Sequence, residues 1–135
     1  MIVLDVRAAI AMISGGEYGV PLRNLVLKGE RIIAPELFKY ELLNAVRKYA
    51  AADYISQNTA TTWYDAGTSL VDEFYPIGDM GAEILAEALA TGHPSYDIAY
   101  LVLARRTAST LFTLDKRLME VCAQRGANCI EKTTL

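Results

Sequence analysis

The chain has 135 residues, of which 53% are hydrophobic and 21% are charged, and its formal net charge is −3. This length suffices to bury the core of one domain, and the composition excludes intrinsic disorder and fibrous repeats. No apolar run approaches the roughly 20 residues that cross a bilayer, and residues 1–5 do not resemble a signal peptide. We therefore expect a single domain over residues 1–135, located in the cytoplasm.

Apolar runs and helix-terminal signals predict alternating strands and helices. In chain order they are a strand at Ile2–Leu4, helices at Ala8–Ile13 and Pro21–Lys28, a strand at Arg31–Ala34, a long helix from Pro35 through Tyr49, a helix at Ser56–Val71, a strand at Phe74–Ile77, helices at Ala82–Ala90 and Tyr96–Arg106, a strand at Thr110–Thr113, a helix at Lys116–Arg125 and a strand at Asn128–Ile130. Pro35 is expected in the first turn of its helix, and Ser56 and Ser95 as N-caps. Strands separated by helices predict an α/β fold, a three-layer α/β/α sandwich around a mainly parallel sheet of four to five strands.

Two aspartates follow predicted strands. Asp5 comes directly after Ile2–Leu4, and Asp115 comes shortly after Thr110–Thr113. Functional groups of open parallel sheets gather beyond the carboxyl ends of the strands, so the two acids could meet in one crevice. The alternatives are a solvated turn for Asp5 and a helix N-cap for Asp115.

Two further acids lie on predicted helices. Asp97 is the only charge between Tyr96 and Ala104, and a helix that is apolar all round is largely buried, where a lone carboxylate needs a partner or a metal. The alternative is an acid stabilised by the helix dipole. Glu41 lies beside the apolar face of the long helix, and its alternative is a boundary residue paired with Lys39 or Lys48.

Four clustered carboxylates would repel one another unless hard cations compensate them. Ligands that are all oxygen favour Mg²⁺ or Mn²⁺, which can activate water for phosphodiester cleavage. If four of the 16 acids share this site, 12 acids remain against 13 basic residues, so the negative net charge does not exclude a nucleic-acid substrate. The single histidine and the spacing of the two cysteines match no zinc motif.

The ordered motifs resemble the PIN-domain family, especially the toxin ribonucleases of VapBC toxin–antitoxin pairs. They are Met1–Asp5, Pro35 with Glu41 and Asn44, Tyr96-Asp97 with Ala99, Tyr100 and Ala104, and Leu111 with Thr113, Asp115, Arg117 and Leu118. The resemblance implies an endoribonuclease that binds one or two Mg²⁺ or Mn²⁺ ions through Asp5, Glu41, Asp97 and Asp115. It also implies a homodimer, an RNA substrate and a cognate antitoxin whose tail occupies the active-site groove.

Several neighbouring residues could support such a site. Thr113 matches a hydroxyl residue of the family and either orients a ligand or is an ordinary strand threonine. Arg7 departs from the family, which usually carries Ser, Thr or Asn there. Our hypothesis is that its guanidinium competes with metal for the acids; the alternatives are that it points along the helix into solvent or binds substrate phosphate. Lys116 and Arg117 are candidates for RNA binding because they adjoin Asp115, whereas Tyr18, Tyr40 and Trp63 are expected in the core or a dimer interface.

Other readings of the sequence remain open. A phosphatase or phospho-receiver could use Asp5 as a nucleophile, but Arg7 occupies the place of the usual second aspartate. A PIN-like domain that has lost catalysis and only binds RNA or protein is the other alternative, and its site would bind Mn²⁺ poorly.

Overall fold

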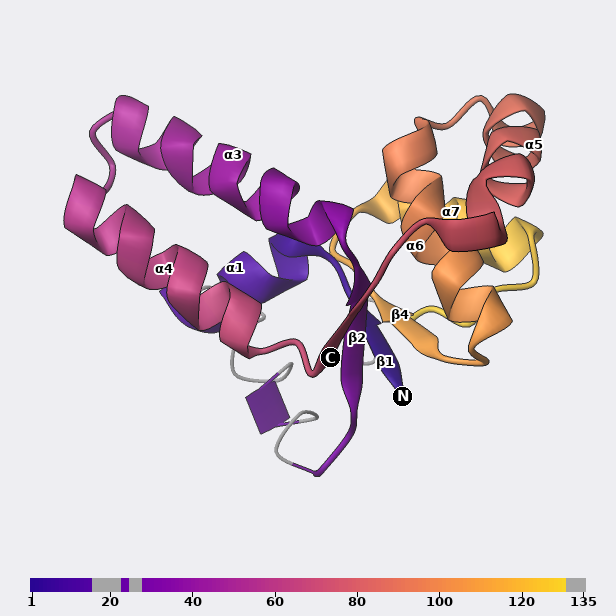
Figure 1. Cartoon of the computed structure of the whole chain (residues 1–135), viewed down its shortest axis with the longest axis horizontal. Helices are drawn as coiled ribbons and strands as arrows, with labels where there is room; N and C mark the ends of the chain where they lie inside the picture. Colours follow the sequence, from indigo (N-terminus) through magenta and orange to yellow (C-terminus); the bar gives the residue numbers. More distant parts are fainter. Residues whose placement is uncertain (16–22, 25–27, 131–135) are drawn as a thin grey trace.

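The computed structural model describes residues 1–15, 23–24 and 28–130. In chain order the elements are β1 (Ile2–Leu4), α1 (Val6–Ser14), β2 (Ile32–Pro35), α3 (Leu37–Ala51), α4 (Gln57–Ser69), β3 (Glu73–Tyr75), the 3-10 helix η1 (Gly78–Met80), α5 (Gly81–Thr91), α6 (Ser95–Arg106), β4 (Thr110–Phe112) and α7 (Lys116–Gln124). The four strands form a parallel sheet in the order β3-β2-β1-β4. Figure 1 shows this sheet between two groups of helices.

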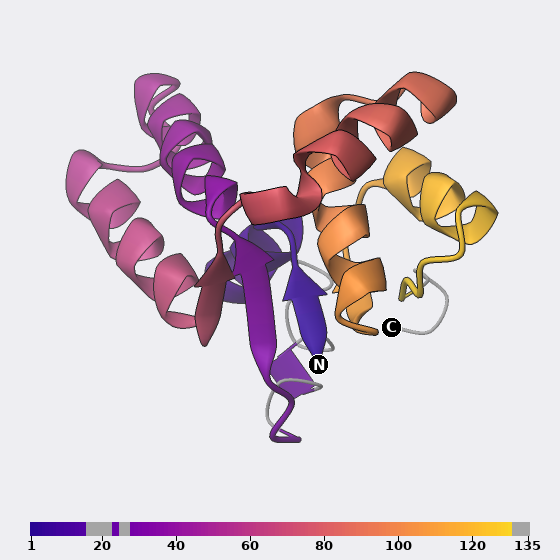
Figure 2. The same ribbon diagram turned by 45° about the vertical axis from the view of Figure 1, so that its right-hand side comes forward.

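The helices cover both faces of the sheet. Helices α1, α3 and α4 lie together on one side, and α5, α6 and α7 lie on the other (Figures 1 and 2). Figure 2 also shows the arrowheads of β1, β2 and β3 directed toward the same end of the molecule. The predicted three-layer α/β/α sandwich with a parallel sheet is confirmed.

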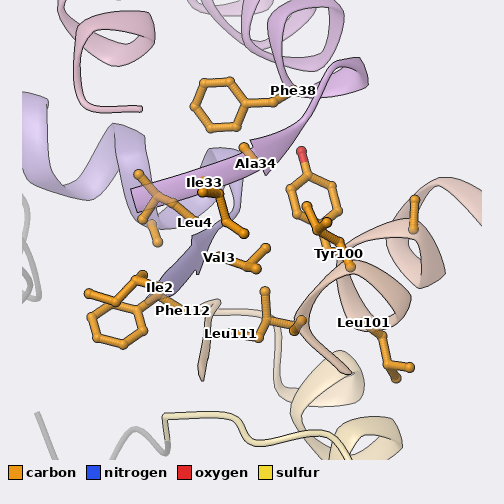
Figure 3. Packing of buried hydrophobic residues seen from close by; sticks show 14 of the residues in the cluster. Ile2, Val3, Leu4, Ile33, Ala34, Phe38, Tyr100, Leu101, Leu111 and Phe112 are labelled. Atoms are coloured by element: carbon orange, nitrogen blue, oxygen red, sulfur yellow. The ribbon is translucent and has the colours of Figure 1, made fainter. Parts of the chain in front are cut away.

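The strands are short. β1 and β2 are wholly buried and β4 nearly so, because helices cover both faces, whereas the edge strand β3 is exposed or partly buried. Val3 is paired in register with Ile33 of β2 and Leu111 of β4. Figure 3 shows Val3 and Leu111 on the α6 side of the sheet, whereas Leu4 points to the opposite face. β1 therefore contributes to both halves of the core, and the residue that follows it is held in a fixed position.

Two predicted helix starts are wrong. Pro35 is the last residue of β2, paired in register with Tyr75, and α3 begins two residues later. The strand continues because the Glu36 N–H donates to the Tyr75 carbonyl at 2.8 Å. Ser95 is the first residue of α6 rather than its cap; the cap is Pro94, whose extended backbone starts the helix and whose carbonyl accepts from Asp97 N–H at 3.1 Å.

The remaining differences concern the ends of elements. The predicted strand Asn128–Ile130 is reduced to a single parallel bridge between Leu111 and Cys129, which marks a fifth strand position beside β4. Ser56 caps α4 as predicted, accepting from Thr59 N–H at 3.1 Å. Most of the predicted helix Pro21–Lys28, and Tyr18, lie outside the described residues. None of the helices that the structure describes is long and apolar enough to span a membrane.

Candidate active site

A cleft of about 1030 Å³ opens at the carboxyl end of the sheet, and all four predicted acids line it. Asp5 follows β1, Asp115 precedes α7 just beyond β4, Glu41 lies in the second turn of α3 and Asp97 in the first turn of α6. The parallel strands deliver these side chains to one edge because every strand ends there. The structure therefore brings together the four acids that the sequence placed at one site.

Asp5 is buried, so the solvated turn considered for it is wrong. Its Oδ1 caps α1 by accepting the Ala8 N–H at 2.9 Å. Burial raises the pKa of Asp5 to about 6, although hydrogen bonds from the Thr113 hydroxyl and the Ala8 N–H oppose the rise. The negative charge of Asp115 adds to it. The carboxylate is thus held in place but poorly compensated.

Asp115 is the N-cap of α7, which was the alternative interpretation of this residue, and it also lines the cleft. Its Oδ1 accepts the Arg117 N–H at 3.0 Å and the Leu118 N–H at 3.3 Å. Its own N–H donates to Thr113 Oγ1 at 3.0 Å. Because Thr113 also bonds to Asp5, this fully buried hydroxyl ties the two aspartates together.

Glu41 is held by a residue that the sequence did not indicate as its partner. The Tyr100 hydroxyl donates to Glu41 Oε1 at 2.7 Å, whereas Lys39, an expected partner, binds Glu36 at 3.0 Å. Figure 3 shows the Tyr100 hydroxyl pointing toward the end of β2. Burial raises the pKa of Glu41 to about 7, Tyr100 opposes this, and the charges of Asp97 and Asp5 increase it.

Asp97 lies at the half-buried mouth of the site. Burial raises its pKa, the nearby His93 lowers it and the charge of Asp115 raises it again. His93 Nε2 lies 3.2 Å from Asp97 Oδ2, a neighbour that sequence reasoning missed. His93 and Asp97 are four residues apart at the start of α6, and this spacing could have indicated the contact from the sequence.

The rim of the cleft is basic and aromatic. Arg7 and Lys48 line it together with Tyr40, Tyr54 and Tyr96. The three tyrosines are 57–79% exposed, so Tyr40 does not lie in the core, and of the two places expected for it only a dimer interface stays a prediction. Arg7 is exposed and, within the described part of the chain, forms no ion pair, although its charge lowers the pKa of Asp5 and Asp97.

Basic residues away from the cleft have other roles. Arg106 bonds to Asp79 at 2.7 Å and to Glu83 at 3.3 Å, which joins α6 to η1 and α5. Lys116 and Arg117 are exposed beside Asp115 and do not line the cleft itself.

The aromatic residue Trp63 is partly buried and packs edge-on against Tyr49, with 5.9 Å between ring centroids.

Comparison with known proteins identifies relatives of the whole fold. Ribonuclease VapC1 of Mycobacterium tuberculosis, in strains CDC 1551 / Oshkosh and H37Rv, is 32% identical over 117 residues, 86% of each chain. The crystal structure of PAE2754 from Pyrobaculum aerophilum superposes with a TM-score of 0.74 at 21% identity, covering 98% of this chain and 90% of that one. VapBC2 from Rickettsia felis, bound to a DNA fragment from its promoter, gives a TM-score of 0.70 at 16% identity, covering 96% and 98%. No family model matches the chain.

Proposed function

The chain belongs to the PIN-domain family of VapC-type ribonucleases, and on that premise we propose that it is a divalent-metal-dependent endoribonuclease, the toxin of a toxin–antitoxin pair. The observation that carries the proposal is the convergence of Asp5, Glu41, Asp97 and Asp115 on one cleft. Burial raises the pKa values of Asp5, Glu41 and Asp97, and the charges of neighbouring acids add to the rise; a bound cation would compensate both effects.

The donor set fits Mg²⁺ or Mn²⁺. Carboxylate oxygens are the ligands these ions prefer, and the four acids offer more of them than one ion needs. When bound, one or two such ions would activate water and stabilise the leaving oxygen of a phosphodiester. The chain itself would hold the ions through the four acids, with no side-chain nucleophile.

Two neutral hydroxyls would orient these ligands. Thr113 fixes Asp5 and Asp115 relative to each other, and Tyr100 fixes Glu41 through its 2.7 Å hydrogen bond. Hydrogen-bonded outer partners of this kind set the direction of metal-binding carboxylates. They also leave the negative charge of the acids intact for the cation.

The rim suits single-stranded RNA. The exposed rings of Tyr40, Tyr54 and Tyr96 offer surfaces on which unpaired bases can stack. Arg7 and Lys48 in the cleft, and Lys116 and Arg117 beside it, would contact phosphates.

The partner proteins are proposed from the family. One structural neighbour is a VapBC complex, and we infer that an antitoxin binds this chain and that its tail occupies the cleft. We also propose a homodimer.

The function is tested by incubating purified, partner-free protein with a mixed RNA pool in Mg²⁺, Mn²⁺ or EDTA. We expect cleavage with at least one metal, none in EDTA, and recovery when the metal is restored, because the acids alone supply no nucleophile. Asp65→Asn, an exposed acid on α4 outside the cleft, should cleave like the parent. Absence of cleavage with both metals would favour a domain that only binds, and a trapped aspartyl-phosphate at Asp5 would favour the phosphatase class.

Arg7 provides a separate test of the metal site. Because its charge acts on Asp5 and Asp97 without a close ion pair, Arg7→Ser should bind Mn²⁺ more tightly by roughly two- to fivefold, the range of an exposed charge interaction of up to about 1 kcal/mol. Calorimetric titration of both proteins measures this. Equal affinities would show that Arg7 does not compete with metal, and a lysine at this position should behave like the parent.

A further inference from the structure

His93 is buried beside the candidate metal site, and neither of its ring nitrogens makes a well-aligned hydrogen bond. It is 5% exposed, and its Nδ1 and Nε2 are the only buried side-chain nitrogens or oxygens in the described part of the chain that lack a hydrogen-bond partner. Nε2 lies 3.2 Å from Asp97 Oδ2 but is poorly aligned for an N–H···O bond. Buried polar atoms nearly always have a well-aligned partner, so an imidazole whose Nδ1 has none and whose Nε2 has only the Asp97 contact needs an explanation.

The imidazole of His93 lies close to two of the acids that would bind a cation, Asp97 and Asp115. One donor atom each from His93, Asp97 and Asp115 lies within 4.8 Å of the other two, and among the described residues no other group of three such side chains meets this condition. Ligands of one small divalent ion are about 3 Å apart when adjacent and about 4 Å apart when opposite, so the three donors need to close by up to about 2 Å. They come from two elements, the start of α6 and the start of α7.

We propose that His93 is a direct metal ligand, and that its nitrogen makes the site bind Mn²⁺ or another first-row transition ion in preference to Mg²⁺. The inference deepens the proposed function, on which it rests, by assigning a ligand and a metal preference to the same site. Imidazole suits transition ions, whereas Mg²⁺ is a hard ion that favours oxygen ligands and keeps several waters. Carboxylates alone suit both Mg²⁺ and Mn²⁺, so the nitrogen ligand would strengthen the preference for the transition ion.

The decisive measurement uses the unmodified protein. His93 is the only histidine of the chain, so any imidazole nitrogen bound to a metal in untagged protein must belong to it. We expect electron spin-echo spectra of the Mn²⁺-loaded protein to carry the ¹⁴N modulation of a directly bound imidazole. Mn²⁺ bound without that modulation would overturn the proposal.

A variant tests the metal preference. His93→Gln should weaken Mn²⁺ binding by at least about 10-fold and leave Mg²⁺ binding, measured by competition, within about twofold of the parent. Equal loss of both metals would indicate that His93 only positions Asp97 and would overturn direct ligation. Ser95→Ala, an exposed change in the same turn, controls for disturbance of the start of α6, and His93→Phe keeps the ring volume should the glutamine variant fold poorly.

The outcomes separate this inference from the proposed function. Mn²⁺ binding through nitrogen without RNA cleavage would leave His93 a ligand and count against the nuclease. Metal-dependent RNA cleavage without nitrogen ligation would support the nuclease and overturn the assignment of His93 as a ligand.

Discussion

Replacing Asp97 with asparagine is expected to reduce RNA cleavage by more than about 100-fold while the protein stays folded. Loss of a partner in the outer shell of a metal site already costs about 10- to 100-fold, and Asp97 would be a direct ligand. Asparagine keeps the shape and one oxygen but loses the charge that attracts the cation. The fold should tolerate the change because burial already disfavours the charged form of Asp97.

Initial cleavage rates at saturating metal, together with a thermal unfolding curve, measure both parts of this prediction. Asp65→Asn removes the same charge from the exposed surface of α4 and should leave the rate unchanged. If Asp97→Asn cleaved RNA within about tenfold of the parent, Asp97 would not be a metal ligand, since no other side chain replaces the lost charge.

Replacing Asp5 with asparagine should stabilise the metal-free protein at high pH while abolishing its activity. Burial raises the pKa of Asp5 from 3.8 to about 6, so the folded state holds this proton more tightly than the unfolded chain does. The resulting stability is present in full below pH 3.8 and is lost as the pH rises through about 6. Two pKa units correspond to about 3 kcal/mol, and asparagine can still accept the Ala8 N–H.

Unfolding by urea in EDTA measures this difference at pH 4 and pH 8. At pH 8 the variant should be more stable by up to about 3 kcal/mol, and at pH 4 the two proteins should be nearly equal. Asp65→Asn should show no comparable change between the two pH values, because that residue is exposed. A variant less stable than its parent at pH 8 would mean that the hydrogen bonds of the Asp5 carboxylate outweigh its desolvation. Adding Mn²⁺ should stabilise the parent and not the variant.

The sequence predicted the layers of the fold and the meeting place of the acids. Short runs rich in β-branched residues, such as Ile2–Leu4, favour strands. Parallel topology sends the carboxyl ends of these strands to one edge, where Asp5 and Asp115 lie. Their role as metal ligands stays a prediction, as does that of Glu41 and Asp97.

The sequence predicted the partners of these acids less well. The bond between Tyr100 and Glu41 joins residues 59 positions apart, and no local pattern indicates which side chain of α6 will reach α3. The misplaced helix starts have a similar cause. Pro35 suits the first turn of a helix as well as the end of a strand, and its pairing with Tyr75 on β3 places it in the strand. Tertiary contacts thus override a local preference at both places.

Because β1 lies between β2 and β4, the cluster of acids can assemble only after β4 has been synthesised. Asp5 is made before Thr113 and Asp115, which follow α6. A nascent chain that ends before β4 lacks both the hydroxyl that orients Asp5 and one of the four acids. The ribosome that translates this chain therefore carries an incomplete site until β4 has emerged, and the cluster of four acids forms only once β4 has docked beside β1.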